Sequence, residues 1–456
     1  MKKMIMAAFA ILLLLCACAP KEEIPPTTVA TEPALVDIGG LELEPEATRI
    51  DLTGLEFDVS MLADASEKLT QLSMIELGHT KLNVEQIELL QLAYPDAVIH
   101  YDIEFMGQVL ETDCQYLDAS GMTADLSGEL LRIVNLLPML REINFVSEDG
   151  ICAFTAENID CLDQIRESFP ELYLRISLDL FGQTVTSEDE RIEYYLVEIG
   201  NEGADVIRKV LPYLRSCTYL LMEGCGVDNE VMAGLRDDFP NTKVVWRVWL
   251  VEEDYNSKLF LRCGSFLTDT HRVRTTYIND ENSHVLNYCT QTKYLDVGHV
   301  DKLTQCGFLA YMPELEVCII ALTNIQDIYP LENHEKLEYL ELFTTPIADL
   351  SPLTTCPNIE HLNIGDMPNV TDISPLYGLT KLKRLRMIHT PQVPNEQKVH
   401  IEQLLTECQF LKDGDWPTGG LWRWADRIKG GRKVPRYELL CEQMEYAIDG
   451  SVYGIP

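Results

Sequence analysis

Between residues 315 and 393 the chain repeats one short pattern of apolar and polar residues. The copies begin at Leu315, Leu337, Ile359 and Leu382, so the spacings are 22, 22 and 23 residues. In the second copy, Leu340 and Leu342 alternate with Tyr339 and Glu341, and a period of two predicts a short strand with one buried face. Such a strand cannot bury that face alone. The fixed period therefore predicts a solenoid of stacked coils.

Each copy also carries signals for a turn and a short helix. Thr345 follows the strand, where its hydroxyl can bond backbone groups of the turn and of the next coil. Ser351–Pro352 predicts a serine N-cap with proline at the first helical position, and Ser374–Pro375 repeats this device. The third copy has Met367 where the others have threonine, and it contains one extra residue. We therefore expect a distorted turn in that copy.

The repeated pattern resembles the 22-residue leucine-rich repeat of internalin-like bacterial surface proteins, L-x-x-L-x-L-x-x-[NT]-x-I-x-D-[IL]-x-P-L. The tight motif covers residues 315–393, and the resemblance in architecture covers about 46–395. It implies an α/β leucine-rich repeat solenoid, with a curved parallel β-sheet on the concave face and helices and short helical turns on the convex face. It also implies a protein or peptide partner on the concave face, without naming a ligand.

Residues 46–251 carry a longer and looser form of the same organisation. Tyr94, Phe169 and Phe239 each precede a proline, end an amphipathic stretch and are followed by a strand-like run. These landmarks lie 75 and 70 residues apart, which predicts coils with the order strand, helix, strand, helix, strand. An ordinary α/β domain with parallel strands is the alternative for this region.

The remaining boundaries in the folded chain are placed where the repeat pattern begins, fails or ends. Residues 252–292 fit neither repeat style and are predicted to be an irregular coil or insertion, and 293–395 hold the 22-residue repeats. Residues 396–456 are predicted to be a C-terminal cap and tail, because the apolar spacing over 399–411 indicates a closing helix. The tail contains Trp422 and Trp424. Packing on the cap is the favoured use of these aromatic residues, and ligand binding is the alternative.

The N-terminus has the pattern of an exported precursor. Residues 1–18 combine two lysines, an apolar run too short to cross a bilayer and a small-residue cleavage context. The end of this stretch resembles a lipobox, which implies lipidation of Cys18; Cys16 is the poorer candidate because Leu15 precedes it. An ordinary secretory signal is the alternative. Residues 19–45 are predicted to be a disordered tether. Together with the lipobox, this predicts a protein that is lipid-anchored at a bacterial cell membrane or cell surface.

The charge of the chain narrows the choice of partners. With 36 basic and 73 acidic residues the formal net charge is −37, so nucleic acid is excluded as a partner because little would neutralise its phosphates. Contact with the membrane is expected through the N-terminal lipid only. The twelve cysteines from Cys114 to Cys441 are scattered and contain no C-x-x-C pair, which argues against a disulfide framework.

Catalytic signatures are missing from the sequence. It contains no H-E-x-x-H, no G-x-S-x-G and no glycine-rich phosphate loop after a strand, so we predict no catalytic residues, no metal and no cofactor. Paired carboxylates of a glycosidase leave no linear signature. A carbohydrate-active hydrolase, with its active site in 252–292 or in the tail, therefore remains one alternative. A purely structural envelope component is another.

The strand alternation indicates which side chains face a partner. In each copy the third, fifth and seventh positions are expected to point out from the concave face. Aromatic and arginine side chains are enriched at binding hot spots. The predicted partner-binding residues are Arg247, Trp249, Ile319, Tyr339, Phe343, His361, Asn363, Arg384 and Arg386.

Overall fold

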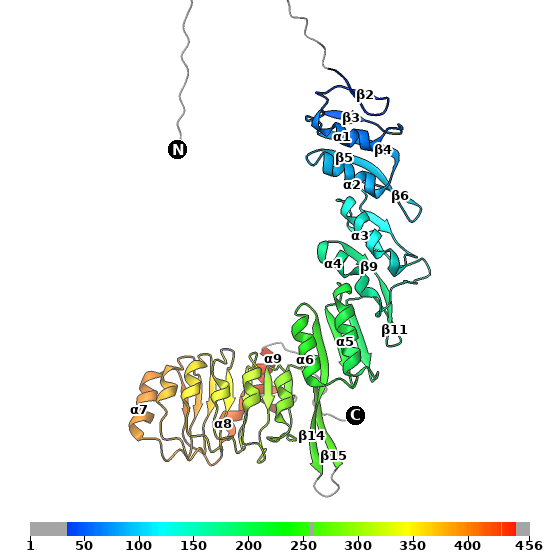
Figure 1. Ribbon diagram of the computed structural model, residues 1–456. Helices are drawn as coiled ribbons and strands as arrows, with labels where there is room; N and C mark the ends of the chain where they lie inside the picture. The colour runs from blue at the N-terminus through cyan, green and yellow to red at the C-terminus, as the bar shows by residue number, and fades with distance from the viewer. Residues whose placement is uncertain (1–33, 255–258, 430, 444–456) are drawn as a thin grey trace, which may run out of the picture. The chain divides into compact units, whose positions relative to one another are not determined.

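A computed structural model describes residues 34–254, 259–429 and 431–443 (Figure 1). The predicted signal peptide, Cys18 and most of the predicted tether lie outside these residues. The chain forms two compact units. One contains residues up to Cys114 together with Arg132–Met139, and the other contains Gln115–Leu131 and everything from Leu140 onward.

The N-terminal unit is built on a four-stranded sheet of order β3-β4-β5-β6, preceded by a small hairpin of β1 and β2. Its elements are β1 (Val36–Asp37), β2 (Glu42–Leu43), β3 (Arg49–Asp51), α1 (Val59–Asp64), β4 (Met74–Leu82), α2 (Val84–Ala93), β5 (Val98–Phe105) and β6 (Gln108–Glu111). Val36 and Ile38 are buried. The last part of the predicted 19–45 tether is therefore folded, because this hairpin supplies apolar side chains to the core.

Two further blocks of the same design follow along the chain, and they belong to the second unit except for Arg132–Leu136, the second half of their first helix. Their elements are β7 (Tyr116–Asp118), α3 (Ser127–Leu136), β8 (Glu142–Asn144), α4 (Asp163–Ser168), β9 (Tyr173–Arg175), β10 (Ser177–Leu180), β11 (Gln183–Thr186), β12 (Arg191–Tyr195), α5 (Gly200–Val210), β13 (Tyr219–Glu223), α6 (Asn229–Asp238), β14 (Lys243–Asp254) and β15 (Leu259–Leu267). Strands β7-β8-β9 and β12-β13-β14 pair in parallel, and β15 pairs antiparallel with β14.

The aromatic–proline landmarks occupy equivalent places in the three blocks. Tyr94, Phe169 and Phe239 are the C-caps of α2, α4 and α6, with φ of −126°, −127° and −124°. The order strand, helix, strand, helix, strand is present in each block. The hairpins that follow the first two blocks were not predicted from the sequence. Their turns are Met106–Gly107 and Phe181–Gly182, in which both residues have positive φ, as two-residue hairpin loops require.

The C-terminal part of this unit is a parallel sheet of order β16-β17-β18-β19-β20-β21-β22. The strands are β16 (Arg272–Arg274), β17 (Tyr294–Asp296), β18 (Val317–Ile319), β19 (Tyr339–Glu341), β20 (His361–Asn363), β21 (Arg384–Arg386) and β22 (Gln409–Leu411). Short 3-10 helices η5 (Ser283–Tyr288), η6 (Gly307–Tyr311), η7 (Tyr329–Leu331), η8 (Ser351–Thr355) and η9 (Ser374–Gly378) and then α7 (Asn395–Leu404) alternate with them.

Two predicted boundaries of the regular repeats change. The sheet begins with β16, so the second half of the predicted irregular region 252–292 is a regular coil, while its residues Glu252–Asp254 and Leu259–Leu267 lie in the paired strands β14 and β15. At the other end, α7 is followed by β22, so the predicted closing helix over 399–411 is a helix and a strand. The first coil was not predicted because its segment, DTHRVRTTYINDENSH, is polar and places the strand β16 among charged residues.

The interior of the coils confirms the leucine-rich repeat fold. Leu340, Leu362 and Leu385 are fully buried, as the period of two predicts. The threonine of the turn bonds within its own coil. The Thr345 hydroxyl donates to the carbonyl oxygen of Leu342 at 2.7 Å, and Thr323 and Thr390 make the same bond.

The copy with the extra residue keeps its turn. Asp366 has φ 52° and its N–H donates to the carbonyl of Ile388 at 3.0 Å, as Thr344, with φ 57°, does to Gly365 in the preceding copy. Met367 is fully buried and fills the place of the threonine. The expected distortion is therefore absent at the start of this turn, because the extra residue is accommodated after Met367.

The serine of the Ser–Pro pairs is not the N-cap. Ser351 and Ser374 are the first residues of η8 and η9. The Ser351 N–H donates to Asp349 Oδ1 at 2.8 Å and its hydroxyl donates to Asp349 Oδ2 at 3.0 Å, and Asp372 serves Ser374 in the same way. The aspartate two positions earlier therefore satisfies the free N–H, because a carboxylate accepts two bonds at once.

Candidate functional site

Strand register places the outward-facing residues of the seven-stranded sheet in two rows, which together we call the concave face. The first residues of successive strands form the row Tyr294, Val317, Tyr339, His361 and Arg384. The third residues form the row Asp296, Ile319, Glu341, Asn363 and Arg386. The predicted patch is therefore contiguous across β18–β21.

This face is covered, so the expectation that its side chains are exposed is wrong. The exposed fractions are 2% for Ile319, 0% for Tyr339, 3% for Phe343, 7% for His361, 0% for Asn363 and 3% for Arg386, and Arg384 is half-buried. The cover is residues 412–443, the C-terminal segment. It contains α8 (Gly420–Arg423), β23 (Trp424–Lys429), β24 (Arg432–Pro435) and α9 (Arg436–Gln443), and Figure 1 shows α8 and α9 among the coils of the sheet.

A buried carboxylate lies at the centre of the contact. The Glu341 side chain is fully buried and accepts hydrogen bonds from the Tyr339 hydroxyl, from Trp422 Nε1 at 2.9 Å and from the Arg423 guanidinium. Burial lowers the pKa of Arg423, but the Glu341 carboxylate more than offsets this and the pKa is raised overall. Burial, together with the Glu341 charge, raises the pKa of Tyr339 well above its ordinary value. The carboxylate therefore faces one cation and two neutral donors.

Aromatic side chains surround this centre. Tyr294, Val317, Ile319 and Tyr339 of the sheet form one buried cluster with Leu411 and with Trp422, Tyr437, Leu440 and Cys441 of the C-terminal segment. The Trp422 ring centroid lies 5.5 Å from that of Tyr339, and the Tyr437 centroid lies 6.1 Å from that of Tyr294. Tyr437, Leu440 and Cys441 follow helical spacing, so they form one face of α9. The segment thus buries an apolar face on the sheet.

The start of the C-terminal segment is held through its backbone. Asn363 Nδ2 donates to the carbonyl of Pro417 at 3.0 Å, and Arg386 Nη2 donates to that of Trp416 at 2.6 Å. A Cβ atom at Gly414 or Gly419 would lie 2.9 or 3.1 Å from Arg386 Nη2. Gly414 has φ 125°, a backbone conformation that favours glycine, and a side chain at either position would require the Arg386 guanidinium to shift.

His361 lies between the sheet and the C-terminal segment. Its ring centroid is 5.9 Å from that of Tyr339 and 6.4 Å from that of Trp422. Burial, and then the positive charges of Arg436, Arg384 and Lys383, lower its pKa to about 3. Its Nδ1 is buried and has no hydrogen-bond partner within the described part of the chain. The imidazole is therefore neutral at physiological pH.

Two predicted residues lie on another sheet. Arg247 and Trp249 are on β14, in the sheet β12-β13-β14-β15, and both are half-buried. Arg247 Nε is 2.6 Å from Glu223 Oε1, and its Nη1 donates to the Ser265 hydroxyl at 3.2 Å. On the same sheet Tyr195 is 55% exposed. The structure therefore does not bring Arg247 and Trp249 into the patch around Glu341.

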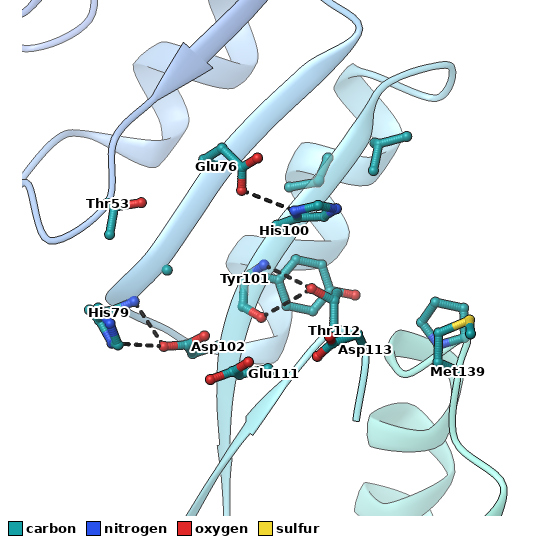
Figure 2. A pocket seen from close by; sticks show the side chains of 14 residues that line it. Thr53, Glu76, His79, His100, Tyr101, Asp102, Glu111, Thr112, Asp113 and Met139 are labelled. Atoms are coloured by element: carbon teal, nitrogen blue, oxygen red, sulfur yellow. Dashed lines mark hydrogen bonds and ion pairs between the residues drawn. The ribbon is translucent and has the colours of Figure 1, made fainter. Parts of the chain in front are cut away.

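The N-terminal unit contains a polar groove of about 500 Å³, shown in Figure 2. Two of its carboxylates lie beside histidines: His100 Nδ1 is 3.0 Å from Glu76 Oε2, and His79 Nδ1 is 3.3 Å from Asp102 Oδ2, while Glu111 and Asp113 also line the groove. Among the described residues, no group of three or more histidine, cysteine or acidic side chains is placed to hold a metal ion. The groove holds two histidine–carboxylate contacts on a surface, and we assign it no chemistry.

Most of the described cysteines are buried. Burial raises the pKa of Cys289 and of Cys306 to about 12. These side chains therefore act as small apolar core residues. In the part of the chain that the structure covers, no helix is both long and apolar enough to cross a bilayer.

Comparison with solved structures finds proteins that are similar to this chain at low sequence identity. An internalin C2 from Listeria monocytogenes is 20% identical over 30% of this chain and 70% of its own, with a TM-score of 0.24. An internalin InlF from the same organism is 17% identical over 83% and 87%, with a TM-score of 0.27. A leucine-rich repeat protein from Leptospira interrogans is 15% identical over 77% and 74%, with a TM-score of 0.30.

No protein-family model and no curated protein matches the chain. The coil geometry of this chain, and not the overall similarity to those structures, therefore carries the fold assignment. Glu341, Trp422 and Arg423 were not predicted from the sequence as members of one site. The helical spacing of Tyr437, Leu440 and Cys441 signalled an apolar face, but no local pattern says which surface that face covers.

Proposed function

We propose that this protein is an exported bacterial lipoprotein that recognises a protein or peptide partner on the concave face of its leucine-rich repeats. The N-terminal sequence supports export and lipidation at Cys18. The predicted absence of a catalytic constellation supports recognition in preference to catalysis, and the acidic composition argues against a nucleic-acid partner. Contact with the membrane is through the lipid only, and no cofactor takes part.

One observation carries this proposal: the concave face already holds a polypeptide. Glu341 accepts hydrogen bonds from Trp422 and Arg423, and both residues lie outside the repeats. Tryptophan, tyrosine and arginine dominate the energetics of protein interfaces. The carboxylate is fully buried and is surrounded by aromatic side chains. This arrangement selects a ligand that is both cationic and aromatic, because water is excluded from the ion pair that the ligand forms with the carboxylate.

The two regions in which a hydrolase active site was expected have other roles in the structure. Part of 252–292 forms the coil that contains β16 and η5, and the tail packs on the concave face. In the groove of the N-terminal unit, Glu76 and Asp102 lie beside His100 and His79. We therefore propose no reaction for this protein, and the structural envelope component remains as an outcome of the experiment below.

Photo-cross-linking in the cells that produce the protein tests recognition. A photoreactive amino acid replaces Trp416, which is 74% exposed beside the concave face, or Tyr195, which is exposed on the sheet of β12. The matched control is Tyr329, 54% exposed on η7, away from both sheet faces. We expect one discrete protein adduct from position 416 and none from 329. Adducts from 195 alone would move the site to the other sheet, and no adduct at any position would favour a structural role.

Lipidation has its own test. Replacing Cys18 by Ala is expected to abolish incorporation of a labelled fatty acid and to move the protein from the membrane fraction to the soluble fraction. Stable anchoring needs two lipid chains at about 0.8 kcal/mol per buried methylene, so loss of the acceptor thiol removes the whole anchor. Cys16→Ala is the matched control and should remain lipidated. Labelling of the Cys18→Ala variant would show that the acceptor was assigned wrongly.

A further inference from the structure

We propose that the C-terminal segment is an intramolecular mimic of the partner: it closes the concave face in the resting protein, and the partner is a polypeptide that presents an aromatic side chain next to an arginine and displaces it. This inference rests on the proposed function and specifies its ligand. Four features of the contact support it.

The C-terminal segment holds its own shape. Its strands β23 and β24 pair with each other in a separate two-stranded sheet. Arg436 Nε donates to the carbonyl of Trp422 at 3.2 Å, and its Nη2 donates to that of Trp424 at 2.9 Å, which ties α9 to α8 and β23. The Arg423 guanidinium lies 5.4 Å from the centre of the Tyr437 ring. The face that meets the sheet is therefore organised by contacts within the segment.

The connection to the repeats permits release. Lys412–Trp416 are exposed, and Gly414 has φ 125°. The described contacts with the sheet face come from side chains and from the carbonyls of Trp416 and Pro417, and the segment adds no strand to the seven-stranded sheet. Undocking the segment therefore breaks no β-ladder of the repeats.

The fit between the segment and the face is incomplete. Three buried polar atoms at the contact have no hydrogen-bond partner among the described residues: His361 Nδ1, Arg386 Nε and Arg423 Nε. His361 is more than nine-tenths buried and faces the Trp422 ring. A buried polar atom without a partner costs free energy. A ligand that keeps the bonds to Glu341 and also bonds His361 and Arg386 therefore binds better than the segment does.

The chemistry of Glu341 defines the ligand. Trp422 supplies an indole N–H and Arg423 a guanidinium, from adjacent positions in the chain, to the two carboxylate oxygens. The partner must offer the same pair, because any ligand without a cation leaves a buried carboxylate uncompensated. A tethered segment competes at an effective concentration on the order of millimolar, so the docked segment weakens partner binding and prevents weak ligands from occupying the face.

Peptide exchange tests this inference with full-length protein. The probe is a fluorescein-labelled peptide with the sequence of residues 419–443, and binding is followed by anisotropy. Trp422→Ala combined with Arg423→Ala in the protein weakens docking of its own segment and leaves the face intact. We expect this variant to bind the probe at least tenfold more tightly than the unaltered protein. Adding Glu341→Gln should abolish binding, and a peptide lacking Trp422 and Arg423 should not bind.

Two controls make each outcome decisive. Arg427→Ala changes an exposed arginine of the same segment that pairs with Glu442, so this variant should behave as the unaltered protein. Alkylation detected by mass spectrometry reports undocking at Cys441 and the integrity of the coils at Cys318, since both thiols are buried. In the double variant we expect Cys441 to react and Cys318 to stay protected.

The opposing results are distinct. If Cys441 reacts, Cys318 stays protected and no probe binds, the segment is a cover and not a mimic. Reaction of Cys318 would make the segment an integral part of the fold, and a dimer in light scattering would identify a second copy as the ligand; each overturns the inference. A cross-linked adduct from position 416 is expected whichever of these results is obtained. Failure of the mimic proposal can therefore be distinguished from failure of the proposed function.

Discussion

Replacing Glu341 by Gln is expected to weaken docking of the C-terminal segment by about 3 kcal/mol, because removing one member of a buried charge pair leaves the other uncompensated. Glutamine keeps the shape of the side chain but removes the charge, and it presents an amide donor where Trp422 and Arg423 also donate. The alkylation rate of Cys441 should rise about a hundredfold, because a change of about 3 kcal/mol raises the population of the undocked state by about that factor.

A matched substitution separates this effect from a general change in charge. Glu314 pairs with Lys336 at 2.5 Å on the surface, with side chains 38% and 52% exposed. Glu314→Gln is expected to change the Cys441 rate by a few-fold at most, since exposed pairs contribute about 0–1 kcal/mol. Equal rates for Glu341→Gln and the unaltered protein would mean that the buried carboxylate does not hold the segment.

Acidification is expected to release the segment through His361. The docked imidazole has a pKa of about 3, below its ordinary value of 6.5. Between these values the undocked state binds a proton and the docked state does not, so docking weakens as the pH falls below 6.5. The groups that disfavour the proton are Lys383 and Arg384 of the sheet and Arg436 of α9. At pH 5 the loss is about 2 kcal/mol relative to neutral pH.

Hydrogen exchange of the amides in α9 measures this effect. After correction for the intrinsic rate, protection should fall roughly thirtyfold from pH 7 to pH 5, the equivalent of about 2 kcal/mol. His361→Gln removes the titrating group and should remove this pH dependence. If the glutamine variant loses protection with pH as steeply as the unaltered protein, another group is responsible.

The coils could be predicted from the sequence because the signals for each strand and helix end lie within a few residues of one another. The alternation around Leu340 and Leu342 identifies a strand wherever it stands, and the aromatic–proline landmarks identify helix ends for the same reason. The capping error at Ser351 has a physical cause as well: Asp349 and Ser351 are both good acceptors near a helix start, and the sequence does not say which one reaches the free N–H.

The candidate site could be predicted only in part. Alternation placed Tyr339, His361 and Arg386 on the concave face, and the strand register confirms that they share it. Their burial could not be foreseen, because alternation tells which side chains leave the coil interior and not whether another segment covers them. Trp422 reaches Glu341 across 81 residues of sequence. Such docking depends on two surfaces that complement each other, and neither surface shows a periodic signal for the other.

The central claim is that the concave face binds a polypeptide partner and that the C-terminal segment competes for it. Its most direct test is the yield of the partner adduct from a photoreactive residue at position 416 in cells, compared between the unaltered protein and the variant with Trp422→Ala and Arg423→Ala. Competition predicts the same adduct in both proteins and a higher yield in the variant. A yield that falls or disappears in the variant would contradict the claim, because it would mean that the docked segment forms the binding surface instead of blocking it.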